Sequence, residues 1–139
     1  MRAMDPAAPD VYFDKPGVAS VSWNEDGHFV LVEWRGWADP TEFAALLEAE
    51  IVALRKHRGS RMLVDGRRQK GLSAADQVFA NEVWLPRALA VGLKRFAVVV
   101  PSSGLAEADL KTRLAKARAK ALEVAYFLTP EEAREWLGR

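Results

Sequence analysis

Hydrophobic positions along the chain follow two periods, one typical of β-strands and the other of helices. Short runs rich in β-branched and aromatic residues predict strands at 18–23, 28–34, 61–65, 95–100 and 122–127. Between and after them, apolar residues recur every three or four positions and predict helices at 40–58, 73–90, 105–120 and 130–137. The predicted order of elements is therefore β-β-α-β-α-β-α-β-α.

The connections between these elements predict how the strands pair. The turn Asn24-Glu25-Asp26-Gly27 joins the first two strands, which must then form an antiparallel hairpin. Each later strand is reached through a helix, as expected for parallel strands joined by right-handed crossovers. We therefore expect an α/β fold in which about four helices cover a mixed five-stranded sheet. Residues 1–16, which contain three prolines, are predicted to form a flexible tail before a single domain at 17–139.

Polar residues mark where the helices begin. Asp39 followed by Pro40 and Glu42 predicts a capping box, and Thr129-Pro130 predicts a second capped start. Ser73, with Asp76 three positions later, predicts a third. The helix that begins there contains Pro86 and should kink or break near Leu85, with a helical turn that resumes to Ala90. Its inner side is expected to hold Phe79, Val83 and Trp84.

The amino-acid composition excludes several classes of function for this chain. The 139 residues include no cysteine, which excludes disulfides, thiolate nucleophiles and cysteine-ligated metal. No apolar run is long enough to span a membrane, and we expect a cytoplasmic protein. The net charge of +1 provides no overall field that would attract nucleic acid. The basic stretch Lys111–Lys120 is interpreted as the solvated side of a helix rather than a lipid-binding or nucleic-acid-binding segment.

Catalytic and metal-binding patterns are missing from the sequence. The two histidines, His28 and His57, lack the spacing of a metal site, and neither belongs to a recognisable nucleophile–base pair. Glu131 and Glu132 lie in a capping turn, which explains them without acid–base chemistry. No glycine-rich loop carries the lysine and hydroxyl of a phosphate-binding loop. The sequence thus predicts neither an enzyme nor a bound cofactor or metal.

The loop after the strand at 61–65 is the strongest candidate site. Ligands of parallel α/β sheets gather at the carboxyl ends of the strands, and a charged cluster falls there. Its members are Asp65, Arg67, Arg68, Lys70 and Ser73. These residues predict a surface for a partner or an anion. The alternative is a solvated loop whose arginines pair with nearby acids.

Four segments resemble a known family, namely VEWRGWADPTEF, LVDGRRQKG, EVWLPRALAVGLKRFAVVV and YFLTPEEAREWL. They are similar to small bacterial STAS-like proteins, which have a SpoIIAA-like fold, and the resemblance runs from about Val18 to Leu137. It implies a sheet in near-sequential strand order. The anti-sigma-factor antagonists of this fold carry a phosphorylatable serine at a helix start, and Ser73 matches that position. Here, however, GRRQKGL precedes the serine and the compact Asp-Ser-Ser-Gly run is missing.

Three hypotheses for function follow. The first is a non-catalytic STAS-like regulatory or protein-interaction module with an unidentified protein partner. The second is a binding module for a small apolar or lipid-like ligand held between the sheet and its helices, since Pro86 and the alanine-rich helix at 105–120 could loosen the packing. The third, an enzyme, has the least support.

Overall fold

The computed structural model describes residues 10–100 and 122–139, and in these the predicted α/β class is confirmed. The strands are β1 (Val11–Lys15), β2 (Ala19–Asn24), β3 (Phe29–Trp34), β4 (Arg61–Asp65), β5 (Arg95–Val99) and β6 (Glu123–Phe127). The helices are α1 (Pro40–His57), α2 (Ala74–Phe79), the π-helical turn η2 (Ala80–Trp84), α3 (Leu85–Ala90) and α5 (Pro130–Leu137). The predicted helix at 105–120, with its basic stretch, lies outside the described residues.

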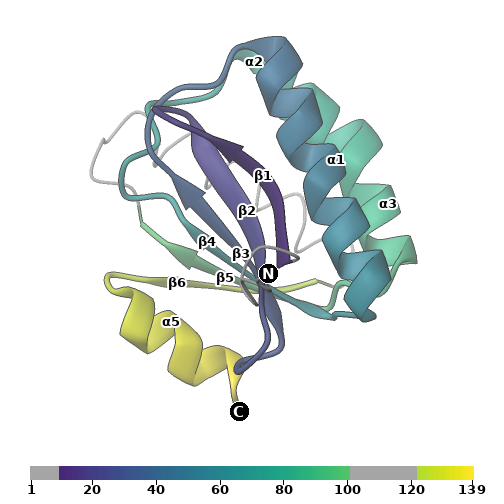
Figure 1. The fold of residues 1–139 in the computed structure, drawn as a ribbon, viewed down its shortest axis with the longest axis vertical. Coiled ribbons are helices and arrows are strands. Elements are labelled where there is room, and N and C mark those ends of the chain that lie inside the picture. Colours follow the sequence, from purple (N-terminus) through teal and green to yellow (C-terminus); the bar gives the residue numbers. More distant parts are fainter. Residues whose placement is uncertain (1–9, 101–121) are drawn as a thin grey trace, which may run out of the picture.

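The described strands form one sheet in the sequential order β1-β2-β3-β4-β5-β6. The hairpin of β2 and β3 is antiparallel, and β3 to β6 are parallel, as the connections predicted. Right-handed crossovers between sequential strands put their helices on the same side. Figure 1 shows α1 and α3, which belong to such crossovers, against one face of the sheet. Helix α5, which follows the last strand, lies against the other face.

Each face of the sheet has its own apolar core. The larger core lies under α1, η2 and α3 and includes Phe43, Leu46, Ile51 and Trp84 with the inward residues of β2 to β6. The smaller core lies under α5, where Ala133 and Leu137 pack on Phe29, Leu63, Ala97 and Val99. The side chain of Arg61 donates to the Leu137 carbonyl at 2.7 Å and fixes the C-terminal end of α5.

The strand count and the tail require correction. Residues 11–15, assigned to a tail, form strand β1, so the sheet has six strands rather than five. Strand β1 pairs antiparallel with β2. It is also held from the side by Tyr12, whose Oη lies 2.7 Å from His57 Nε2, and by Lys15, whose Nζ lies 2.6 Å from Glu42 Oε2. These partners are distant in sequence, which is why the local pattern did not reveal the strand.

The inner side of the second helical segment also differs from the prediction. Trp84 is buried as expected, but Phe79 and Val83 are 37% and 44% exposed. Trp84 and Val83 are adjacent in the helix and point about 100° apart, and the neighbour that is buried with Trp84 is Leu85 rather than Val83. The core takes the stripe of Asp76, Ala80, Trp84 and Ala88. Before Pro86 the structure has a π-helical turn rather than a break, with the Leu85 amide donating to the Ala80 carbonyl, and the helix resumes as α3 to Ala90, as expected.

Candidate functional site

Two loops meet at the carboxyl ends of the parallel strands. One runs from β3 to α1 through Gly36 and Trp37, and the other runs from β4 to α2 over residues 66–73. The Lys70 amide donates to the Gly36 carbonyl at 3.2 Å and joins the two loops. In Figure 1 this is the end of the sheet at which α1 and α2 begin. Ligands of such sheets bind at this end.

The side chain of Arg67 is paired within its own loop. Its guanidinium donates to both carboxylate oxygens of Asp65, with Nε–Oδ1 at 2.9 Å and Nη2–Oδ2 at 2.7 Å. These charge-assisted bonds raise the pKa of Arg67 above its ordinary value, and the carboxylates of Glu131 and Glu33 act in the same direction. For Arg67, the structure therefore matches the alternative of an arginine that pairs with nearby acids.

Arg68 and Lys70 differ from Arg67, and both side chains are exposed. Within residues 10–100 and 122–139, neither forms an ion pair or a side-chain hydrogen bond. Two cations without a bound acid among these residues can be neutralised by a partner at little structural cost.

Trp37 also lies at this end of the sheet, and the sequence analysis did not include it in the candidate site. The residue is 52% exposed, although its loop neighbours Gly36 and Ala38 are buried. A tryptophan after an apolar strand is usually a core residue, so no local signal indicated that this one points outward. Its loop is anchored by the Gly36 amide, which donates to the Val18 carbonyl at 3.2 Å. We call Trp37, Arg68 and Lys70 the strand-end surface.

Ser73 caps α2, as predicted. The Asp76 amide donates to Ser73 Oγ at 3.0 Å, and the backbone of Ser73 has the extended geometry of an N-cap residue. Such a cap contributes about 1 kcal/mol to stability. No hydrogen bond or ion pair within the described part of the chain joins Ser73 to the cations of its loop.

Gln69, between Arg68 and Lys70, points the other way and is only 1% exposed. Among the described residues, neither atom of its side-chain amide has a hydrogen-bond partner, and the same holds for Asn81 Oδ1 and Trp84 Nε1. A buried polar group without a partner costs about 1–3 kcal/mol. Gln69, Asn81 and Trp84 are therefore places where the described residues leave buried polar atoms without a hydrogen bond.

Comparison with protein families decides the identity of the fold. The model of the SpoIIAA-like family matches residues 29–138, which is most of the chain. The chain belongs to the SpoIIAA-like family. No curated protein and no solved structure matches it. The matched region of this SpoIIAA-like protein contains the whole strand-end surface, whereas β1 and β2 precede it.

The histidines of the SpoIIAA-like protein have structural partners. His57, the last residue of α1, stacks on Trp23 with the ring centroids 4.4 Å apart and contacts Tyr12. The rings of His28 and Trp23 meet edge to face at the β2–β3 turn, with their centroids 5.6 Å apart. The described residues hold no cluster of three or more histidines and acids that could bind a metal. No helix in the same ranges is long and apolar enough to span a membrane.

Proposed function

We propose that this SpoIIAA-like protein is a non-catalytic interaction module that binds a partner protein through its strand-end surface. The observation that carries the proposal is a half-exposed tryptophan, Trp37, in a loop joined by a backbone hydrogen bond to the loop of Arg68 and Lys70. Tryptophan and arginine are among the residues that most often dominate binding energy at protein interfaces.

The chemistry of the surface indicates the chemistry of its partner. Arg68 and Lys70 favour an acidic segment, because opposite charges speed association and fix its orientation. Trp37 offers a large apolar area that an aliphatic or aromatic side chain of the partner would cover. The Lys70–Gly36 hydrogen bond holds the two loops together before binding, which lowers the entropic cost of association.

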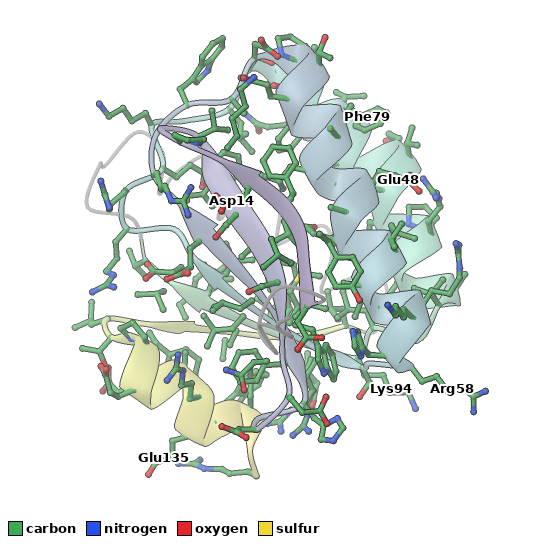
Figure 2. All side chains as sticks on the ribbon, viewed as in Figure 1. Asp14, Glu48, Arg58, Phe79, Lys94 and Glu135 are labelled. Atoms are coloured by element: carbon green, nitrogen blue, oxygen red, sulfur yellow. The ribbon has the colours of Figure 1, made fainter. Side chains whose placement is uncertain are left out.

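Affinity purification with matched variants tests this proposal. Trp37→Ala and the double variant Arg68→Glu/Lys70→Glu should each lose the same specific protein that the wild type recovers. The control is Arg58→Glu/Lys94→Glu, which reverses two exposed cations at the other end of the molecule (Figure 2) and should retain that protein. Equal recovery by all variants would place binding elsewhere.

Ser73→Asp, which keeps a capping carboxylate, should also retain the protein, because Ser73 serves as a helix cap.

A small ligand held beneath the helices is the second candidate, and the unpartnered atoms of Gln69, Asn81 and Trp84 in the described part of the chain favour it. A small molecule with polar and apolar parts could supply hydrogen bonds to such atoms while its apolar part is buried. Native mass spectrometry of freshly purified protein separates the two candidates. A co-purifying small mass that is lost from Gln69→Leu would support the ligand, and a spectrum of the bare chain would count against it.

A further inference from the structure

A groove lies at the carboxyl ends of β5 and β6. Its volume is about 330 Å³, and it is lined by Val100, Tyr126, Phe127, Leu128 and Glu132. All of these except Glu132 have apolar or aromatic side chains, and Leu128 is 76% exposed. Pockets of this kind take the apolar side chains that anchor a protein partner. We call these lining residues the β5–β6 groove.

Backbone hydrogen bonds connect the β5–β6 groove to the loop that carries the cations of the strand-end surface. In the loop after β4, the Gly66 amide donates to the Val99 carbonyl at the end of β5, at 3.1 Å. The Val100 amide then donates to the Phe127 carbonyl at the end of β6, at 2.8 Å. In Figure 1, β4, β5 and β6 end on the side of the molecule at which α5 begins. The groove and the strand-end surface therefore share one end of the sheet and are held together by its backbone.

The strand-end surface is too small to bind a protein by itself. A specific interface normally buries about 800 Å² of each partner and includes about 20 to 30 residues on each side. Trp37, Arg68 and Lys70 can form only a part of such a contact. Along this end of the sheet, the contact can extend either past the end of β3 toward β1 or past the end of β4 toward β6.

The two directions differ in the charges that a partner would cover. Toward β1, Lys15 Nζ lies 2.6 Å from Glu42 Oε2, and Arg35 Nη1 lies 2.8 Å from Asp14 Oδ1. A partner that covered these ion pairs would remove water from charges that already neutralise each other, which costs free energy without a new pairing. Toward β6, the β5–β6 groove offers apolar surface whose burial favours association. The interface therefore continues more favourably toward β6.

Resting on the proposed function, we propose that the β5–β6 groove is a second anchor of the same interface and takes an apolar side chain of the partner protein that covers Trp37. The strand order places the loop of Arg68 and Lys70, after β4, between Trp37 and the groove. The acidic residues of the partner therefore lie between its two apolar anchors. The ends of β3 and β6 are three inter-strand spacings apart, at least about 14 Å, so the partner presents a segment of at least about four extended residues.

Isothermal titration calorimetry with matched variants tests this inference. The probe is the partner chain that a photoreactive phenylalanine analogue at Trp37 captures, identified by mass spectrometry and then purified. Leu128→Asn, which replaces the apolar contact by a neutral polar group of similar size, should raise the dissociation constant at least about tenfold. Leu128→Met should bind like the wild type, as should the control Val11→Asn, at a 46% exposed valine that begins β1. The effects of Leu128→Asn and Trp37→Ala should multiply in the double variant, because sites this far apart act independently.

The outcomes separate this inference from the proposed function. If Leu128→Asn binds as tightly as the wild type while Trp37→Ala binds more weakly, the groove is not an anchor and the strand-end surface still is. Equal losses from Leu128→Asn and Val11→Asn would overturn the groove as well. Wild-type binding by Trp37→Ala, or no partner captured at Trp37, would contradict the proposed function and this inference with it. Circular dichroism of Leu128→Asn should match that of the wild type, because the Leu128 side chain faces solvent in the free chain.

Discussion

Replacing Trp84 by alanine is expected to lower the free energy of unfolding by about 3–5 kcal/mol, a large fraction of the total stability of an ordinary domain. Trp84 is only 5% exposed and meets Phe96 of β5 edge to face, with the ring centroids 6.4 Å apart. It ends the π-helical turn and holds segment 74–90 on the sheet. Truncation leaves a large cavity that the sheet beneath cannot close.

Urea denaturation monitored by circular dichroism measures this effect. The matched control is Val83→Ala, at the neighbouring position, whose side chain is 44% exposed and should change stability by no more than about 0.5 kcal/mol. Equal effects from the two substitutions would mean that the inner stripe of the helix has been assigned wrongly.

Replacing Gly36 by alanine is expected to cost about 1–3 kcal/mol, because the chain has no room for a methyl group at this position. A Cβ atom on Gly36 would lie 2.5 Å from the Gly17 carbonyl oxygen, and that atom belongs to the backbone rather than to a flexible side chain. The loops of β1–β2 and β3–α1 would have to separate. Trp37 would move with them, so partner binding should weaken together with stability.

Gly138→Ala provides the comparison for Gly36→Ala. A Cβ atom at Gly138 would meet its nearest neighbour, the Arg134 carbonyl oxygen, at 3.5 Å, which is an ordinary contact. Thermal unfolding should therefore show a clear loss for Gly36→Ala and almost none for Gly138→Ala. A Gly36→Ala protein as stable as the wild type would show that the two loops do not approach each other this closely.

Local signals in the sequence predicted most of the fold. The N-caps at Asp39, Ser73 and Thr129 each accept a hydrogen bond from an amide three residues later, so a short window of sequence contains the whole interaction. The buried strands likewise stand out as apolar runs bounded by turn residues. The resemblance to STAS-like proteins is confirmed by the family match and by the sequential strand order.

The features that the sequence did not reveal depend on contacts between distant residues. Strand β1 pairs with β2 and is held from the side by Tyr12 against His57 and by Lys15 against Glu42, and neither of these pairs is visible in a local pattern. The helix after Ser73 offered two apolar stripes, and only packing on the sheet decided that Trp84 is inside while Phe79 is outside.

The candidate loop was located from its position after a strand, but the roles of its residues depend on side-chain directions. Arg67 folds back on Asp65, Gln69 turns inward, and Arg68 and Lys70 stay exposed. In the sequence these neighbouring residues have the same polar character. Trp37 joins them only through the backbone contact between Lys70 and Gly36.

Site-specific photo-crosslinking tests the central claim, that the strand-end surface binds a partner protein, most directly. A photoreactive phenylalanine analogue placed at Trp37 should crosslink to one discrete partner chain in the cell. The same analogue at Val11, a 46% exposed apolar residue that begins β1 and pairs with Ser22 near the opposite end of the sheet, serves as the comparison and should give none of that product. The crosslink from Trp37 should disappear when Arg68→Glu/Lys70→Glu is added. Products of the same kind from both positions, or no product from Trp37, would contradict the account.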